Sequence, residues 1–239
     1  DSLVLRFKEL LKRNRDKNPA ILFTCLPGYP EDYSNCELLM EAAEEAGFMA
    51  VFEYMDNIIF SDDAEEGGVY RRNPLTQEYE QYPFLFKLIP WEWFCWDEPE
   101  VLKIITDLVK TNDLIVVNPA YSLIYQSKAL MAEAWEKFRL DERSDYLLAT
   151  SLEQLPDKHQ VKKPIFGREG ANVTIISEMG AVEEKTDGIY DEQQMVYQEY
   201  AYFPTDGEGY QYQTGVFYAE EPAGLAFRRS KGIIDNLAQ

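Results

Sequence analysis

The residues best suited to chemistry lie between positions 161 and 175, where a lysine-bearing segment leads into a loop of small residues. Lys163 belongs to the β-rich part, and Arg168 and Glu169 belong to the loop. An ammonium and a guanidinium suit phosphate oxygens, since a guanidinium can donate to two of them at once. A neighbouring carboxylate suits the Mg²⁺ that accompanies a polyphosphate. The segment therefore predicts a polyphosphate site, with a charged β-hairpin turn as the alternative.

The glycines of this loop, Gly167 and Gly170, let the backbone approach a ligand closely and offer its amides to an anion. The loop is not a P-loop, because it lacks the Gly-Lys-Ser/Thr ending and because a strand rather than a helix is expected to follow it. We therefore expect a strand-loop-strand unit around the site.

The charge of the chain makes clustered cations informative. Its 239 residues carry a formal net charge of −20, a field that repels nucleic acid and anionic membranes. We expect neither as a partner, and the sequence contains no apolar run long enough to span a membrane and no signal peptide. A phosphate site in this chain must therefore gather its own lysines and arginines.

The cysteines indicate a cellular location, and the two ends of the sequence indicate whether it is a fragment. Cys25, Cys36 and Cys95 cannot all pair, and their spacing fits no zinc pattern. Free thiols predict a reducing, cytoplasmic location. The sequence opens at Asp1 without a methionine and ends at Gln239 within an expected strand, so we expect a fragment of a longer protein.

The N-terminal part predicts a small α/β layer. Residues 2–13 place apolar side chains on one helical face, residues 20–25 form a short apolar run, and residues 35–46 predict a helix that ends at Gly47. Residues 48–54 predict a second strand. This strand-helix-strand order favours a parallel pair of strands.

The rest of the chain divides into a mixed region and a β-rich region. Residues 56–82 are polar and predict an irregular excursion or a hairpin. Strands are expected near 84–88 and 114–117, and helices at 99–110 and 127–137. After residue 157 the pattern becomes typical of an antiparallel sheet, with β-rich runs at 159–165, 172–177, 194–200, 209–218 and 223–228.

Several further blocks follow one another along the chain: Phe84-Leu-Phe-Lys-Leu-Ile-Pro-Trp-Glu-Trp, Asn118-Pro-Ala-Tyr, Gln126-Ser-Lys-Ala-Leu, Val196-Tyr-Gln-Glu-Tyr-Ala, Glu221-Pro-Ala-Gly-Leu and Ile234-Asp-Asn-Leu. In type and order they resemble blocks of the glutathionylspermidine synthase-like group of ATP-grasp ligases. The resemblance covers nearly the whole chain, so the blocks are specific together although no single one would be.

The resemblance implies an ATP-grasp-like fold of mixed α/β and α+β class. Residues 1–155 would form a pre-ATP-grasp α/β lobe with the first ATP-grasp elements, and residues 156–239 a mainly antiparallel sheet lobe with the nucleotide-binding loop. It also implies an ATP-dependent carboxylate–amine ligase, with ATP and Mg²⁺ as cofactors and an acyl phosphate as intermediate. The substrates would be a peptide-like carboxylate, such as glutathione, and an amine, such as a polyamine.

The resemblance also assigns roles to individual residues. Phosphate binding falls to Lys128, Lys163, Gly167 and Gly170, and catalysis at the transferring phosphoryl group to Arg168 and Arg228. Metal binding falls to Glu169, Asn172 and Asn236. Binding of the adenosine part falls to Gln198, Glu199, Tyr200 and Ala201, although Glu199 also fits a half-exposed strand carboxylate.

Two alternatives stay open at this point. The family's Asp-Tyr-Asn-Ala-Asp-like metal and substrate segment is missing from the sequence, so the chain also fits a catalytically inactive, ATP-grasp-like nucleotide-binding or interaction module.

The aromatic cluster Trp91, Trp93, Phe94 and Trp96 favours a packed core between the lobes over a base-stacking surface. Lys87, just before it, fits either a site residue or an edge lysine whose charge reaches solvent.

Overall fold

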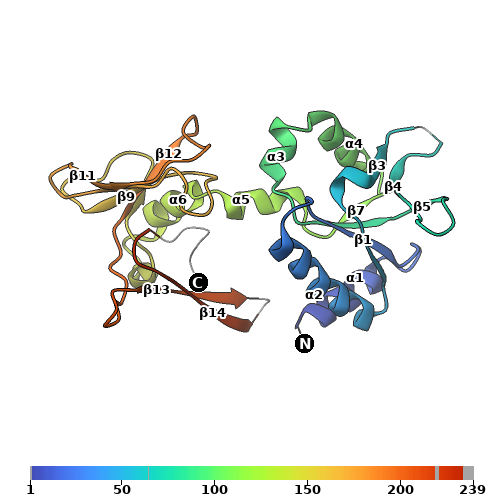
Figure 1. Cartoon of the computed structure of the whole chain (residues 1–239), viewed down its shortest axis with the longest axis horizontal. Coiled ribbons are helices and arrows are strands. Elements are labelled where there is room, and N and C mark those ends of the chain that lie inside the picture. The colour runs from blue at the N-terminus through green and yellow to red at the C-terminus, as the bar shows by residue number, and fades with distance from the viewer. Residues whose placement is uncertain (1, 64, 219–220, 234–239) are drawn as a thin grey trace. The chain divides into compact units, whose positions relative to one another are not determined.

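The computed structural model of the chain describes residues 2–63, 65–218 and 221–233. It divides into two compact units, the first comprising the residues up to Leu123 together with Glu221, and the second running from Ile124 to Tyr218 and again from Pro222 (Figure 1). This division reflects packing alone, and the functional division between residues 155 and 156 stays a prediction. Within the described residues, no helix has the length and apolar character needed to cross a membrane.

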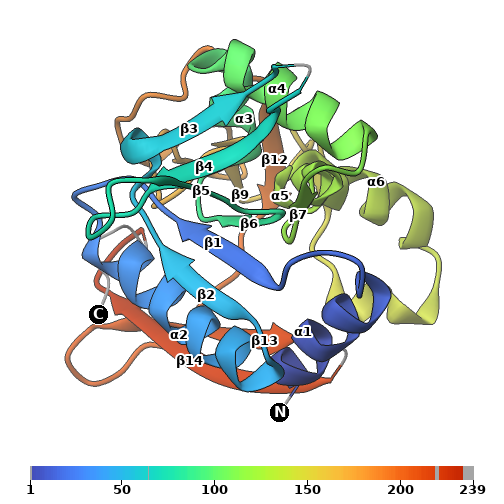
Figure 2. The ribbon, with the colours of Figure 1, turned by 90° about the vertical axis from the view of Figure 1, so that its right-hand side faces the viewer.

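A four-stranded parallel sheet organises the first unit. Its strands β1 (Ala20–Thr24), β2 (Met49–Phe52), β6 (Phe84–Lys87) and β7 (Ile115–Val116) lie in the order β2-β1-β6-β7. Figure 2 shows β1 and β2 as neighbouring strands. The parallel pair predicted from the strand-helix-strand order is therefore confirmed.

One face of this sheet is covered by α1 (Ser2–Arg13) and α2 (Pro30–Ala46). Phe7 of α1 packs with Phe23 of β1 and with Phe84 of β6 in one apolar cluster. The backbone N–H of Gly47 binds the carbonyl of Glu44 and that of Phe48 binds Ala43, with Gly47 at φ 105°. Glycine adopts this left-handed conformation at little cost, so it ends the helix at the predicted residue.

The other face is covered by α3 (Trp91–Trp96), α4 (Pro99–Lys110) and a three-stranded antiparallel sheet. That sheet comprises β3 (Ile58–Ser61), β4 (Gly68–Arg72) and β5 (Tyr79–Gln81), preceded by the 3₁₀ turn η1 (Met55–Asn57). The hairpin expected in 56–82 is thus present and gains a third strand. Trp91 and Phe94 pack in the core of the first unit itself, whereas Trp96 is exposed.

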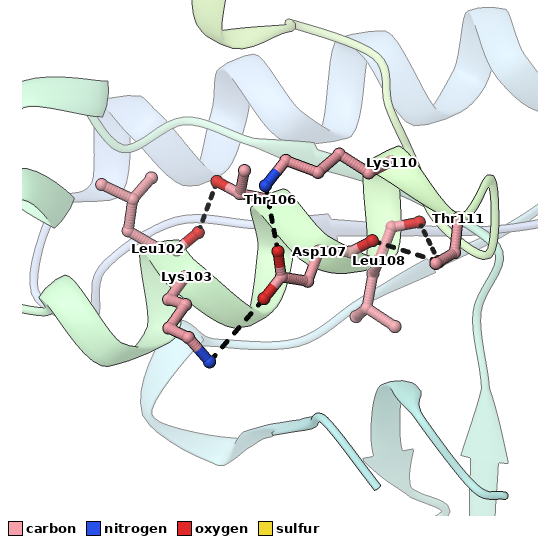
Figure 3. A network of polar contacts seen from close by, with 7 residues as sticks. All are labelled: Leu102, Lys103, Thr106, Asp107, Leu108, Lys110 and Thr111. Carbon is pink, nitrogen blue, oxygen red and sulfur yellow. Dashed lines mark hydrogen bonds and ion pairs between the residues drawn. The ribbon is translucent and has the colours of Figure 1, made fainter. Parts of the chain in front are cut away.

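Helix α4 has a buried apolar face and an outer face of polar contacts, and Figure 3 shows the polar contacts. Ile105 and Leu108 are buried, while the outward Asp107 accepts a hydrogen bond from Lys110 and pairs with Lys103 at 3.7 Å. The Thr111 hydroxyl donates to the carbonyls of Asp107 and Leu108. These carbonyls lie in the last turn, where the helix offers no further backbone N–H donors. The Thr111 hydroxyl therefore supplies a hydrogen bond that the helix itself cannot.

The second unit contains a five-stranded antiparallel sheet in the order β11-β10-β9-β12-β8. Its strands are β8 (Thr150–Ser151), β9 (Gln160–Pro164), β10 (Thr174–Ile176), β11 (Val182–Lys185) and β12 (Met195–Glu199). A separate hairpin joins β13 (Gln211–Tyr218) to β14 (Pro222–Ser230). Its helical elements are α5 (Leu123–Gln126), which begins at the last residue of the first unit, α6 (Ala129–Phe138) and η3 (Glu142–Tyr146), while η2 (Ala120–Ser122) belongs to the first unit.

This architecture confirms the mixed α/β class and the antiparallel C-terminal part, and it corrects two details. Glu183 and Glu184 belong to the exposed edge strand β11, which the sequence did not predict. The helix expected at 127–137 begins at Ala129 and follows the separate short helix α5. Charged residues are uncommon in strands, which is why the edge strand escaped sequence reasoning.

Candidate functional site

A cavity of about 600 Å³ lies within the second unit, a volume in the range of small-molecule sites. It is bounded by β9, β12, the loop between β9 and β10, and the β13–β14 hairpin. The following predicted residues line it: Lys128, Lys163, Gly167, Arg168, Glu169, Gly170, Gln198, Glu199, Tyr200, Ala201 and Arg228. The fold thus gathers at one place residues that are a hundred positions apart, while their individual roles stay predictions.

Lys163 reaches this cavity from the middle of β9. Its ammonium donates a hydrogen bond of 2.7 Å to Oε1 of Gln198 on the neighbouring strand β12. Burial lowers the pKa of Lys163, because a charged group loses water contacts there. Lys162 precedes it in the same strand and therefore projects from the opposite face.

Lys128 approaches the same cavity from the start of α6. Its backbone N–H donates to the carbonyl of Ile165 at 2.8 Å, and its ammonium donates to the carbonyl of Gly167. Both acceptors belong to the segment that follows β9. The helix start and the loop are therefore joined through one residue, which places its ammonium beside the predicted phosphate loop.

The loop between β9 and β10 has an unusual backbone. Glu169 (φ 53°), Gly170 (φ 69°) and Asn172 (φ 56°) all adopt positive φ. A Cβ added at Gly167 would lie 2.5 Å from Cγ of Pro164, so a side chain there would require a shift. Gly167 therefore leaves room for Pro164, and Gly170 adopts a left-handed conformation that glycine tolerates.

Asn172, a predicted metal ligand, uses its side chain within the protein. Its Oδ1 accepts a hydrogen bond of 2.8 Å from the backbone N–H of Tyr190, and its Nδ2 donates to the carbonyl of Gly188 at 3.4 Å. Among the described residues it lies outside the cavity lining. Asn236 lies outside the described residues, so its predicted role has no structural counterpart here.

The residues present fit one Mg²⁺ when phosphate oxygens complete its ligands. No group of three or more His, Cys, Asp or Glu that could hold a metal occurs in residues 2–63, 65–218 and 221–233. Magnesium, however, is commonly bound by one or two carboxylates together with substrate phosphates and water. Glu169 and Glu184 both line the cavity and offer such carboxylates, and Glu184 was missed by sequence reasoning.

The residues predicted to hold the adenosine part lie at the end of β12 and directly after it. Nε2 of Gln198 donates to the Thr150 hydroxyl at 3.0 Å, and Glu199 pairs with the Lys158 ammonium at 2.6 Å. The backbone N–H of Tyr200 donates to the carbonyl of His159. The side chains of Gln198 and Glu199 are therefore held by neighbours that the sequence did not identify.

His159, the single histidine of the chain, supports this end of the cavity. Its ring stacks on Tyr200 with centroids 4.2 Å apart, and Nδ1 lies 2.9 Å from the Tyr202 hydroxyl. Nε2 lies 3.0 Å from a carboxylate oxygen of Glu183. These ring contacts are all to neighbouring side chains, which agrees with a packing role.

Arg228 and Lys231 bring further positive charge to the cavity. Arg228 pairs in register with Gln213 on the β13–β14 hairpin, and Arg229 alternates away to lie over the ring of Tyr210. Lys231 was not predicted. Its position three residues after Arg228 was the only sequence signal that Lys231 could reach the cavity. Lys231 follows the end of β14, however, so the alternation of side chains along a strand does not predict where it points.

Lys87 proves to be neither a cavity residue nor a solvent-reaching lysine. It is 1% exposed in the first unit, and its ammonium donates to the carbonyl of Ile89 at 2.7 Å and lies 3.7 Å from the ring centroid of Trp91. Burial lowers its pKa to about 7, against the opposing effect of Glu92. The edge-lysine interpretation is therefore wrong.

A smaller cavity, of about 290 Å³, belongs to the first unit. Leu26 and Ile89, which follow β1 and β6, line it, so it lies beyond the carboxyl ends of the parallel strands. Its charged lining residues are Asp56, Asp97 and Glu98, which repel an anion. The larger cavity, with its lysines and arginines, is therefore the better polyphosphate site.

Comparison with known proteins agrees with these observations. The family model described as glutathionylspermidine synthase preATP-grasp matches residues 1–239. A putative acid–amine ligase of Haemophilus influenzae is 26% identical over 189 residues, 79% of this chain and 44% of the relative. The bifunctional glutathionylspermidine synthetase/amidase of Escherichia coli is 30% identical over 96 residues, 39% of this chain and 15% of the relative.

Trypanothione synthetase of Crithidia fasciculata is 29% identical over 133 residues, 54% of this chain and 20% of the relative. Each alignment thus spans less than half of the relative's length. The relatives are ligases by name, and the family model extends over all residues of this chain. The chain belongs to the glutathionylspermidine synthase pre-ATP-grasp family.

Proposed function

We propose that the protein binds Mg-ATP in the cavity of the second unit and takes part in an ATP-dependent carboxylate–amine ligation. The observation that carries this proposal is the gathering of Lys128, Lys163, Arg168 and Arg228 around one cavity in a chain of net charge −20. The cavity is also lined by the carboxylates of Glu169, Glu184 and Glu199, so cations for phosphate oxygens and carboxylates for a metal lie at one place.

In this proposal the two lysines and Arg168 bind the phosphates, and Arg228 faces the transferring phosphoryl group. Glu169 holds Mg²⁺ beside them. Of the two further ligands predicted from the sequence, Asn236 lies outside the described residues and the carboxamide of Asn172 contacts Tyr190 and Gly188. The metal supplies charge neutralisation at the phosphate oxygens. Gln198, Glu199, Tyr200 and Ala201 hold the adenosine part.

The reaction that fits such a site needs cations more than acids and bases. A carboxylate oxygen of the first substrate attacks the terminal phosphorus of ATP, which gives an acyl phosphate and ADP. The nitrogen of an amine then attacks the carbonyl carbon, phosphate leaves, and the nitrogen loses a proton to form the amide. Exclusion of water from the acyl phosphate prevents its hydrolysis.

The substrates are proposed from the names of the relatives. Glutathionylspermidine synthetase joins a peptide to a polyamine by its name, and the Haemophilus relative is named as an acid–amine ligase. We therefore propose a peptide-like carboxylate, such as glutathione, and an amine, such as a polyamine. We also infer a reducing, cytoplasmic setting from the free cysteines, of which Cys25 and Cys36 are buried.

The second candidate function is a nucleotide-binding module without turnover. The contacts of Asn172 favour it, because the carboxamide of this predicted metal ligand is already engaged with Tyr190 and Gly188. The presence of Glu169 with Lys128 and Lys163 at one cavity favours the enzyme.

A thermal-shift titration of the chain with Mg-ATP tests the nucleotide site. We expect stabilisation that Lys163→Ala and Glu169→Ala abolish and that Lys162→Ala, on the opposite face of β9, preserves. Absence of stabilisation in the wild-type chain would remove the site. Phosphate release that requires both glutathione and spermidine would then separate a ligase from a binding module.

A further inference from the structure

The loop that carries Arg168 and Glu169 is held in a conformation that its residues do not prefer. Glu169 and Asn172 adopt φ values of 53° and 56° on either side of Gly170. A glutamate is disfavoured in this region because its side chain crowds the backbone, whereas asparagine tolerates it. The hydrogen bonds that hold the following residues, Gly170 to Val173, come from residues 186–190.

Thr186 connects both sides of the loop through one hydroxyl. Its Oγ1 donates to the carbonyl of Gly170 and accepts a hydrogen bond of 2.9 Å from the backbone N–H of Val173. Its backbone N–H also donates to the carbonyl of Val173 at 2.9 Å. A hydroxyl can donate and accept at once, and no apolar side chain of the same shape can replace it.

Asn172 makes the second connection. Its carboxamide bridges Tyr190 and Gly188 as described above, and its own backbone N–H donates to the carbonyl of Asp187 at 3.4 Å. A Cβ at Gly188 would lie 2.3 Å from Oδ1 of Asn172. The carboxamide therefore fills the space that a side chain at position 188 would take, and the two segments fit closely.

We propose that Thr186 and Asn172 together form a brace that positions Arg168 and Glu169 at the cavity before any nucleotide binds. They are positioning residues, since they act through the loop. The proposal rests on the proposed nucleotide site for its functional meaning. It gives Asn172 a role that needs no metal, because both ends of its carboxamide already contact the protein.

The preformed loop has a measurable advantage. A loop that becomes ordered only on binding loses conformational entropy at that step, which weakens the affinity. A loop that is ordered beforehand does not have this cost. Loss of the brace should therefore weaken Mg-ATP binding even though neither brace residue lines the cavity.

Hydrogen exchange of the amides of residues 170–173, in the chain without nucleotide or metal, tests the brace directly. Thr186→Val keeps the shape and removes the hydroxyl, and we expect exchange at least about tenfold faster than in the wild type. Thr186→Ser should restore slow exchange. Thr214→Val, at an exposed threonine of β13, is the matched control and should leave the loop unchanged. Unchanged exchange in Thr186→Val would overturn the proposal.

Asn172→Asp separates the brace from a metal ligand. In the brace, aspartate still accepts from Tyr190 but directs a charged oxygen at the carbonyl of Gly188, so the loop should exchange faster without metal. The Mg²⁺ concentration that half-saturates Mg-ATP binding should stay within about twofold of the wild type. Slow exchange together with a lower Mg²⁺ requirement would overturn the brace and support metal ligation.

Nucleotide titration of the same variants distinguishes failure of the brace from failure of the nucleotide site. We expect the Kd of Thr186→Val for Mg-ATP to rise about three- to tenfold, with recovery in Thr186→Ser. A faster-exchanging loop with wild-type affinity would overturn the positioning role. If the wild-type chain binds no nucleotide, the proposed function fails and the positioning role fails with it, whatever the exchange rates show.

Discussion

The Lys163 ammonium donates a hydrogen bond of 2.7 Å to Oε1 of Gln198, and this pairing orients the glutamine. With Oε1 as acceptor, Nε2 of Gln198 faces the Thr150 hydroxyl, to which it donates at 3.0 Å. Thr150 is almost fully buried, so the chain of contacts is anchored in the sheet. The ammonium therefore occupies a fixed position at the cavity without any ligand.

Removal of this ammonium should weaken nucleotide binding. We expect Lys163→Ala to raise the Kd for Mg-ATP at least tenfold, a loss of about 1.4 kcal/mol, because its ammonium lies at the cavity lining and Lys162 does not. Isothermal titration provides the measurement. Lys162→Ala removes the same charge from the same strand and should change the Kd less than about threefold. Equal effects would show a general charge effect instead of a contact.

The binding of Mg-ATP should also depend on pH through Lys163. Burial lowers its pKa, so the ammonium loses its proton at a lower pH than an exposed lysine does. Affinity should therefore fall as pH rises through that lowered pKa. A Kd series from about pH 7 to pH 10 for wild type and Lys163→Ala isolates the effect, since the alanine variant should lack this component. Parallel profiles would contradict the assignment.

Lys87 should make the stability of the first unit depend on pH. Its pKa is about 7 in the folded chain against the ordinary 10.5, so the unfolded chain binds more protons between these values. The free energy of unfolding should therefore rise with pH across that window, by at most about 1.4 kcal/mol per unit.

Urea unfolding of the wild type and of Lys87→Met at several pH values gives the measurement. The difference between the two stabilities should shift in favour of the wild type as pH rises from about 7 to 10. Lys110→Met, at an exposed lysine of α4, should retain the wild-type rise. A constant difference between wild type and Lys87→Met would contradict the buried-ammonium interpretation.

The three thiols should differ sharply in reactivity. Burial raises the pKa of Cys25, and burial together with Cys25 raises that of Cys36 to about 12, so neither forms much thiolate at neutral pH. Cys95 is exposed. Titration with a chromogenic disulfide reagent should show one fast thiol in the native chain and three in denaturant. Cys95→Ser should remove the fast one, and rapid reaction of all three would contradict the packing.

Phe23 should contribute strongly to the stability of the first unit. It is fully buried in β1, with its ring 5.4 Å from that of Phe86 and 6.3 Å from that of Phe7. Phe23→Ala should cost roughly 3–5 kcal/mol, because it removes apolar contacts and leaves a cavity. Leu38→Ala, at a residue 60% exposed, should cost less than about 0.5 kcal/mol. Denaturant unfolding measures both.

Much of the fold could be predicted where local pattern and tertiary packing agree. Helix α1 begins and ends at the predicted residues, and α2 ends before Gly47 as expected. Helix α3 escaped prediction because its six residues are mostly aromatic, a composition that favours strands as much as helices. Strand β11 escaped because nothing in Val182-Glu-Glu-Lys alternates between apolar and polar.

The candidate site was predictable to the extent that a family pattern marks its residues. Lys128 and Lys163 were found through the resemblance, and their convergence on one cavity is visible only in three dimensions. Thr150 and Thr186 could not be found, since a buried hydroxyl that orients a neighbour leaves no pattern in a single sequence. Lys87 shows the converse, because an unremarkable lysine proved to be buried.

The exposed strand β11 has a consequence for the behaviour of the protein at high concentration. It forms one edge of the five-stranded sheet, and unpaired edge strands recruit strands from other molecules. β11 is four residues long and carries Glu183, Glu184 and Lys185 on its exposed surface. A second copy that added there would bring like charges together, so this edge should resist self-association, and replacement of the two glutamates by threonine should promote aggregation.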